Sequence, residues 1–267
     1  MKQISILGCG WLGLPLAQSL IANGFEVKGS TTSEDKLSVL KTAGMEPFKI
    51  ALSEDKIGGD LEEFLNTSEI LIIDIPPNLR KADSESFVEK IKNLIPFIEK
   101  SSIKKVVFIS STSVYGEEND LVTEETLTNP DTESGKQLVE TEKLLQSNKN
   151  FKTTVIRFGG LIGEDRNPVH SLAGKTNLEN SNKPINFIDQ KDCIGIILKI
   201  IETSSWNETF NAVAPFHPTR RNYYTQKAKE LNLVPPAFLE DKTTIGKTIS
   251  SDKVLNVLGY NFQKATL

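Results

Sequence analysis

Ile4-Ser5-Ile6-Leu7-Gly8-Cys9-Gly10-Trp11-Leu12-Gly13 is the stretch that decides the fold. A short apolar strand runs directly into a G-x-G-x-x-G turn, and the turn opens a segment that predicts a helix over 12–22. Gly8 makes the tight turn, Gly10 lets backbone N–H groups approach a pyrophosphate, and Gly13 lets the helix pack closely on the sheet. The helix N-terminus adds unpaired donors and a partial positive charge. We therefore predict a dinucleotide-binding turn made by Gly8, Gly10, Trp11, Leu12 and Gly13.

The first 160 residues alternate short apolar runs with longer segments of helical period, which is typical of βα units that build a parallel sheet. The predicted strands are 4–7, 26–30, 47–51, 70–75, 106–110 and 154–158. The predicted helices are 12–22, 34–43, 61–65, 84–100 and 136–147. Because Ile70-Leu71-Ile72-Ile73 is apolar on both faces, helices must cover both sides of the sheet. We predict a doubly wound parallel α/β sheet of the Rossmann type, with strand order 3-2-1-4-5-6.

The regular pattern loosens after residue 160. The stretch 163–183 is rich in Asn, Pro and Gly, and prolines break up the tail from residue 215 onward. Between them, 185–201 and 210–213 return to helix and strand patterns. We therefore predict a dinucleotide-binding core of 1–160 and 185–213, with a small discontinuous C-terminal substrate lobe of 161–184 and 214–267.

Charge and composition exclude several classes of partner. The 267 residues carry 31 Lys and Arg against 35 Asp and Glu, a net charge of −4 without the basic excess that nucleic acids or anionic membranes require. No segment has the roughly 18 to 20 apolar residues of a membrane span, and glycines interrupt the apolar N-terminal run. Two Cys and two His, widely separated, predict no metal site. We expect a cytoplasmic protein with a small-molecule substrate and no nucleic-acid or membrane partner; monomer and homodimer both remain open.

The end of the second strand bears on which dinucleotide binds. In Lys28-Gly29-Ser30-Thr31-Thr32-Ser33 no carboxylate stands where NAD-binding folds use one to hold the ribose 2′-hydroxyl. Hydroxyl groups, backbone N–H groups and Lys36 suit a 2′-phosphate instead. We predict Ser30, Thr31, Thr32 and Ser33 as cofactor-binding residues, with NADP preferred and NAD as the alternative. Thr32 or Ser33 also suits the cap of the next helix, and both interpretations hold together.

Several later motifs extend this pattern to most of the chain. The fifth strand leads into Ser110-Ser111-Thr112-Ser113-Val114-Tyr115-Gly116, the sixth into Arg157-Phe158-Gly159-Gly160-Leu161-Ile162-Gly163, and Asn129-Pro130 precedes a helix. With the glycine turn, these motifs resemble the extended short-chain dehydrogenase/reductase superfamily of NAD(P)-dependent sugar-nucleotide epimerases and dehydratases. Ala214-Pro215-Phe216-His217-Pro218 resembles an atypical branch labelled only as NAD-dependent epimerase/dehydratase family. The resemblance implies oxidoreduction or epimerisation of a small hydroxyl- or carbonyl-bearing substrate.

By this resemblance the family's catalytic Ser or Thr falls on Ser111. The carboxyl ends of the strands meet at one crevice, where we also expect Pro76 and Ser110 to contact the cofactor. The family's Tyr-Gly-Lys-x-Lys pattern falls on Ser134-Gly135-Lys136-Gln137-Leu138, with Ser in the Tyr position and Leu in the Lys position. The usual relay needs a Tyr hydroxyl as acid and base and a Lys that lowers its pKa, so that relay cannot operate here.

Three explanations of this departure remain open. Tyr115, Lys136, His170 or His217 supplies the proton; or water or the substrate does; or the protein performs no reaction and senses the dinucleotide. We predict Ser111 and Tyr115 as catalytic residues and keep a catalytically inactive NADP-binding sensor as the alternative.

Three further residues have structural interpretations. We expect Cys9 to pack beside the cofactor, Arg157 to be structural, and Asp192 to cap or open a helix over 192–201.

Overall fold

The computed structural model describes residues 2–79, 84–118, 120–240 and 246–266. Residues 1, 80–83 and 119 of the predicted core, and 241–245 and 267 of the predicted lobe, lie outside the described residues. The main sheet consists of β1 (Gln3–Leu7), β2 (Glu26–Thr31), β3 (Glu46–Lys49), β6 (Ile70–Ile73), β7 (Lys105–Ser111), β9 (Lys152–Phe158) and β12 (Thr209–Ala212). The helices are α1 (Gly13–Ala22), α2 (Leu37–Thr42), α3 (Leu61–Leu65), α4 (Phe87–Lys100), α5 (Glu133–Ser147), α6 (Gln190–Thr203), α7 (Arg220–Glu230) and α8 (Asp252–Leu258).

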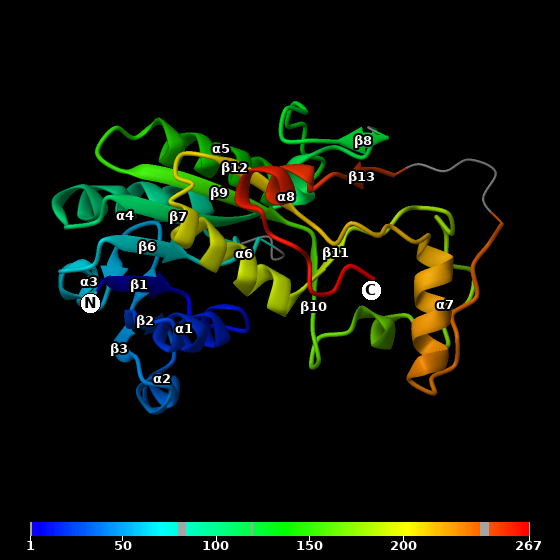
Figure 1. Ribbon diagram of the computed structural model, residues 1–267, viewed down its shortest axis with the longest axis horizontal. Helices are drawn as coiled ribbons and strands as arrows, with labels where there is room; N and C mark the ends of the chain where they lie inside the picture. Colours follow the sequence, from blue (N-terminus) through cyan, green and yellow to red (C-terminus); the bar gives the residue numbers. More distant parts are fainter. Residues whose placement is uncertain (1, 80–83, 119, 241–245, 267) are drawn as a thin grey trace.

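All neighbouring strands of the main sheet are parallel, in the order β12-β9-β7-β6-β1-β2-β3. The predicted order of the first six strands is confirmed, and β12 adds a seventh strand at the β9 edge (Figure 1). This is the predicted doubly wound α/β fold. The carboxyl ends of β1, β2, β6 and β7 therefore share one edge of the sheet, where such folds bind ligands.

Helices cover both faces of the sheet (Figure 1), and β6 shows why its sequence requires this. All four of its residues are buried, with Ile70 and Ile72 in a cluster with α1, α6 and α8, and Leu71 and Ile73 in a cluster with α3, α4 and α5. Successive side chains of a strand point to opposite faces. A strand that is apolar at every position is therefore stable only between two apolar layers.

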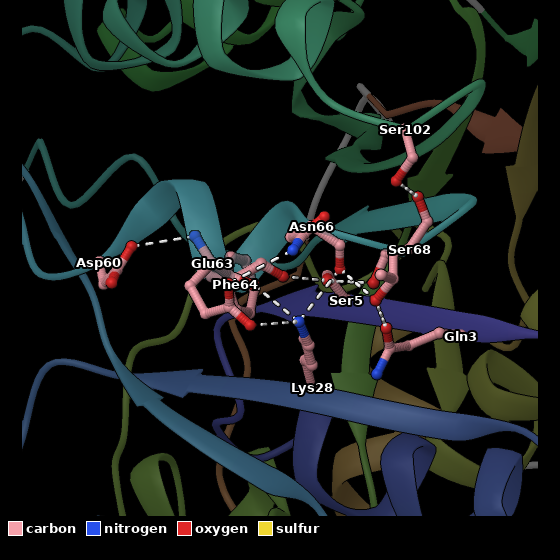
Figure 2. A network of polar contacts seen from close by, with 10 residues as sticks. Gln3, Ser5, Lys28, Asp60, Glu63, Phe64, Asn66, Ser68 and Ser102 are labelled. Carbon is pink, nitrogen blue, oxygen red and sulfur yellow. Dashed lines mark hydrogen bonds and ion pairs between the residues drawn. The ribbon is translucent and has the colours of Figure 1, made fainter.

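A polar network fixes the short helix α3 against β1 and β2 (Figure 2). The buried Lys28 ammonium donates to the carbonyl oxygens of Glu63, at 2.7 Å, and Asn66, at 3.0 Å. The Ser5 hydroxyl donates to the Phe64 carbonyl at 2.6 Å and lies 2.8 Å from the Ser68 hydroxyl. The last carbonyls of a helix have no partner within the helix, so these side chains supply the missing donors.

Part of the chain after residue 160 forms a separate small apolar cluster. Val169, Ile185, Tyr223, Tyr224 and Ala228 pack together, beside the short pair β10 (Gly160–Ile162) and β11 (Phe187–Asp189). Figure 1 shows α7 in this part of the molecule, away from the main sheet.

The last helix does not join this small cluster. Val254 and Leu258 of α8, with Tyr260, pack in the cluster that also holds α1 and α6. The small cluster thus does not extend along the whole 214–267 segment that the sequence assigns to the lobe, because the apolar face of α8 packs against the core.

The remaining strands are short pairs outside the main sheet: β4 (Ala51–Leu52) with β5 (Ile57–Gly58), and β8 (Leu121–Val122) with β13 (Thr248–Ile249). Short 3-10 helices of three or four residues are η1 (Glu34–Lys36), η2 (Thr112–Val114) and η3 (Pro168–Ser171).

Asp192 does not cap helix α6, although it lies in the first turn of that helix as the sequence predicts. Helix α6 begins at Gln190, and its cap is Asp189, whose carboxylate accepts from the Lys191 N–H at 2.8 Å. Asp192 is fully buried, and its carboxylate accepts from the Tyr260 hydroxyl at 2.8 Å and from the backbone N–H of Gln263 at 2.7 Å. Asp192 therefore anchors the C-terminal segment rather than the start of its own helix.

Candidate dinucleotide and substrate sites

The three glycines of the turn have different surroundings. Gly8 has a φ of +108°, and a Cβ there would lie 2.3 Å from the Asp74 carbonyl oxygen. A Cβ on Gly13 would lie 2.3 Å from the Gly8 carbonyl oxygen, whereas a Cβ on Gly10 would have no atom within 4 Å. Backbone strain and packing therefore require Gly8 and Gly13, but nothing inside the protein requires Gly10. Open space at this position is what a pyrophosphate needs at a helix N-terminus.

Ser30 holds the turn in place. Its hydroxyl accepts a hydrogen bond from the Gly8 N–H at 3.0 Å, and its carbonyl accepts one from the Cys9 N–H at 2.8 Å. The predicted cofactor residue is thus already bonded to the turn that the cofactor would contact.

The turn opens into a cavity of about 330 Å³ at the carboxyl ends of β1, β2 and β6. Six of the predicted cofactor residues line this cavity: Gly8, Gly10, Ser30, Thr31, Thr32 and Pro76. The structure brings these six together from three separate strand ends. The other five do not line it: Trp11, Leu12, Gly13, Ser33 and Ser110.

Two lysines and an aspartic acid line this cavity: Lys36, Lys90 and Asp74. Burial raises the pKa of the Asp74 carboxyl to about 8, and a hydrogen bond from the Gly13 N–H opposes this shift only in part. A carboxyl group that is largely neutral at pH 7 does not repel phosphate groups strongly. Sequence reasoning missed Asp74 and Lys90; the position of Asp74 directly after an apolar strand was the available signal for it.

Cys9, Trp11 and Leu12 are held by the protein itself. Leu12 and Cys9 are buried in the core, and burial raises the pKa of the Cys9 thiol to about 12, which agrees with packing. The Trp11 indole N–H donates to Asp165 at 2.7 Å, and the Arg166 guanidinium lies 5.0 Å from its ring centroid. Trp11 faces a second cavity, of about 780 Å³, which Gly10 also lines.

Ser110 and Tyr115 belong to one buried polar network. Arg157 donates from two nitrogens to the Glu142 carboxylate, at 2.6 to 3.2 Å, and the Ser110 hydroxyl donates to the same carboxylate at 2.5 Å. The Tyr115 hydroxyl accepts from Arg157 at 2.6 Å and donates to Asn211 at 2.9 Å. Arg157 is structural, as the sequence predicts.

This network does not favour a catalytic role for Tyr115. The side chain is 1% exposed, and burial raises the pKa of its hydroxyl above the ordinary value. Both hydrogen-bonding functions of the hydroxyl are engaged inside the protein. Tyr115 also does not line the cavity in which Ser111 lies.

Ser111 lines a third cavity, of about 530 Å³, between the end of β7 and the small cluster. Its hydroxyl accepts from the Ser113 N–H at 3.1 Å, which fixes the side chain at the strand end. The cavity also holds Lys183, Arg220, Lys247 and Glu117, none of which the sequence singled out.

The other groups considered as proton donors lie elsewhere. Lys136 and His170 are exposed, and neither lines the cavity of Ser111. His217 lines a different cavity, next to Tyr260, where burial lowers the pKa of its imidazole.

Comparison with known proteins agrees with this geometry. Residues 8–186 match the model of a family described as NAD(P)H-binding. This chain belongs to that NAD(P)H-binding family. It is also 32% identical to protein YeeZ of Escherichia coli strain K12, over 98% of this chain and 96% of the relative.

The fold of this chain is similar to solved structures of the short-chain dehydrogenase/reductase type. One is UDP-glucuronic acid 4-epimerase from Bacillus cereus in complex with NAD, with a TM-score of 0.82 and 18% identity, covering 98% of this chain and 92% of that one. Another is a short-chain dehydrogenase/reductase superfamily protein from Agrobacterium tumefaciens with bound NAD, with a TM-score of 0.79 and 18% identity, covering 98% and 93%. The chain therefore has an NAD(P)-binding domain in a fold of the epimerase/dehydratase type.

In the part of the chain that the structure describes, no group of three or more His, Cys, Asp or Glu side chains is arranged to hold a metal ion. Within the same ranges, no helix combines the length and the apolar character that crossing a bilayer requires.

Proposed function

We propose that this protein uses NADP in preference to NAD for the oxidoreduction or epimerisation of a small hydroxyl- or carbonyl-bearing substrate. The observation that carries the proposal is the open space at Gly10, in a cavity shared with Thr31, Thr32 and Lys36. The cavity combines a helix N-terminus with hydroxyl donors and a cation.

The preference for NADP rests on charge at the end of β2. The nearest carboxylate in sequence, Glu34, pairs with Lys49 at 2.8 Å and does not line the cavity, whereas Lys36 does. A 2′-phosphate would meet a cation there, and the ribose of NAD would find no carboxylate from β2 to hold its 2′-hydroxyl.

We call the cavity that Ser111 lines the substrate cavity. There the Ser111 hydroxyl would hydrogen-bond the reacting oxygen of the substrate and hold it in position. A bound dinucleotide would supply or accept the hydride. The proton requires a source other than the family's pair, because Leu138 is buried in the apolar core and Ser134 offers only a hydroxyl. Water or the substrate is the simplest source, given the internal partners of Tyr115.

A second candidate function is dinucleotide sensing without catalysis. The specific observation in its favour is Leu138, since an apolar side chain fills the position where the resemblance requires a charged Lys. In that case the cofactor would bind and the substrate cavity would support no turnover.

The test uses purified full-length chain titrated with NADPH and NADH by nucleotide fluorescence. We expect Gly10→Glu to weaken binding more than 100-fold, because its Cβ would have no protein atom within 4 Å and the added negative charge would repel the phosphates of the dinucleotide. Gly58→Glu is the matched control, at an exposed glycine outside the cavity. Absence of saturable binding in the wild type would overturn the proposal, and tighter binding of NADH would overturn the preference.

Catalysis is tested separately by following NAD(P)H oxidation with carbonyl and sugar-nucleotide substrates. We expect turnover that falls at least tenfold in Ser111→Ala. Cofactor binding without turnover on any substrate, together with a partner whose binding depends on the cofactor, favours the sensor.

A further inference from the structure

The cavity that holds Ser111 has an excess of positive charge. Lys183, Arg220 and Lys247 line it, and Glu117 is the one carboxylate among its described lining residues. These four residues come from separate parts of the chain. Glu117 lies in a loop after β7 and Lys183 in the loop before β11. Arg220 begins α7, and Lys247 lies in the segment before β13.

Lys247 is the most deeply buried of these cations. It is 6% exposed, and its ammonium donates to the Tyr115 carbonyl at 2.6 Å and pairs with Glu117 at 3.2 Å. A buried ammonium is costly unless its charge is compensated. An ammonium has three N–H donors, and these two oxygens are its partners among the described residues.

Glu117 cannot compensate both lysines. It pairs with Lys183 at 2.7 Å through one oxygen and with Lys247 through the other. Although burial opposes ionisation, the two ammonium groups hold the pKa of Glu117 below its usual value, so it is a carboxylate at neutral pH. One negative charge shared by two positive ones leaves one positive charge in excess.

Arg220 adds a second positive charge. Its guanidinium donates to the carbonyl oxygen of Glu179 at 2.5 Å and lies 5.5 Å from the Phe238 ring centroid. Neither partner carries a negative charge, so neither neutralises the arginine.

The backbone around Lys247 is rigidly placed. Thr248 and Ile249 pair with Leu121 and Val122 as β13 and β8. The Asn186 side chain donates to the Lys247 carbonyl at 2.8 Å and accepts from the Ile249 N–H at 2.9 Å. Lys247 is therefore held at the cavity wall by contacts of its own carbonyl and of the two residues that follow it, as a preorganised binding group requires.

We propose that the cavity beside Ser111 binds an oxyanion of the substrate, either a carboxylate or a phosphate, and that Lys247 is the buried cation that anchors it. Lys183 contributes the second ammonium, and Glu117 limits the affinity by competing for both. This inference rests on the proposed function, since it assigns the same cavity to the substrate and narrows the substrate to an anionic one.

The experiment measures binding of inorganic phosphate and of malonate by calorimetric titration, with glycerol as a neutral control. The full chain is titrated with and without saturating NADPH, because by the proposed function NADPH would occupy the cavity at the glycine turn, whereas the test anions would bind in the cavity beside Ser111. We expect saturable binding of at least one anion and none of glycerol; stronger phosphate binding identifies a phosphate-bearing substrate, and stronger malonate binding a carboxylate.

Three variants separate an anion site from a merely structural lysine. Lys247→Met should weaken anion binding about tenfold, the value of one charge-assisted hydrogen bond, and Glu117→Gln should strengthen it severalfold. Lys104→Met is the matched control, since it removes an exposed Lys at the opposite end of β7. If Lys247→Met does not fold, Lys183→Met replaces it with the same expected direction.

The proposal is overturned by absence of saturable anion binding, by an equal loss in Lys104→Met, or by weaker binding in Glu117→Gln. A structural role for Lys247 predicts no gain in Glu117→Gln, so the opposite signs of the two effects are decisive. Failure of NADPH binding with intact anion binding would refute the proposed cofactor and leave the anion site standing.

Discussion

Replacing Lys28 by Met removes the donors that hold the end of α3 and keeps most of the apolar stem. Lys28 is 2% exposed, and its ammonium donates to the carbonyls of Glu63 and Asn66 (Figure 2). Its charge is compensated in part by the Glu63 carboxylate at 3.8 Å, which is itself half exposed. The Asn66 carbonyl also accepts from the Thr67 hydroxyl at 2.6 Å, so the Glu63 carbonyl is the one that depends on Lys28 for a side-chain donor.

The magnitude follows mainly from the Glu63 carbonyl oxygen, which loses its side-chain donor, since the Asn66 carbonyl keeps the donor of Thr67. A buried acceptor without a partner costs about 1 to 3 kcal/mol, and a cation at a helix C-terminus adds about 0.3 to 1 kcal/mol. The substitution also removes the desolvation cost of burying the Lys28 ammonium, which offsets part of this loss of stability. We expect the free energy of unfolding of Lys28→Met to fall by about 2 kcal/mol.

Urea denaturation followed by circular dichroism measures this loss. The slope of the free energy of unfolding against urea concentration should be the same in the variant and the wild type. Lys41→Met, at an exposed Lys of α2, is the control and should change stability by less than about 0.5 kcal/mol. A loss below that value in Lys28→Met would refute the reasoning, since burying the charge would then cost as much as its hydrogen bonds contribute. NADPH affinity should not change, because Lys28 does not line the cavity at Gly10.

Three further predictions concern the turn and the buried ion pair. Gly13→Ala should destabilise the fold by about 1 to 3 kcal/mol in urea denaturation, because its Cβ would lie 2.3 Å from a carbonyl oxygen; stability equal to the wild type would contradict this. Glu142→Gln should cost about 3 kcal/mol by breaking the buried pair with Arg157, and Glu142→Leu combined with Arg157→Met should recover much of it; a double variant as unstable as the single one would count against the argument. Because the pKa of Asp74 is raised to about 8 in the folded protein, the folded state binds more protons than the unfolded one from about pH 4 to pH 8. Stability should therefore decline as pH rises through this window, and Asp74→Asn should flatten the decline in thermal unfolding measured at several pH values.

The sequence predicts features that depend on neighbours in the chain. Strand order follows from the βα alternation, and the roles of Gly8 and Gly13 follow from a local turn. Lys247 was missed because its partner Tyr115 lies 132 positions away, and no periodicity connects the two. The internal partners of Tyr115 are also far away in the sequence, since Arg157 lies 42 positions and Asn211 lies 96 positions later. Motif spacing places a residue at a strand end but does not show whether its hydroxyl faces a cavity or the core.

The two kinds of polar contact in this fold separate stability from ligand binding. At Lys28 and at Asp192, strong donors or acceptors are matched by groups of the protein itself, so removing either side costs folding free energy. At Gly10 the backbone faces open space, and around Lys247 the single carboxylate of Glu117 is shared by two lysines while Arg220 has no carboxylate partner among the described residues that line the cavity. A protein gains no stability from leaving these groups uncompensated. The proposed phosphate and substrate oxyanion would supply the missing negative charge, and both cavities lie at the carboxyl ends of strands of the main sheet, at β1 beside Gly10 and at β7 beside Ser111.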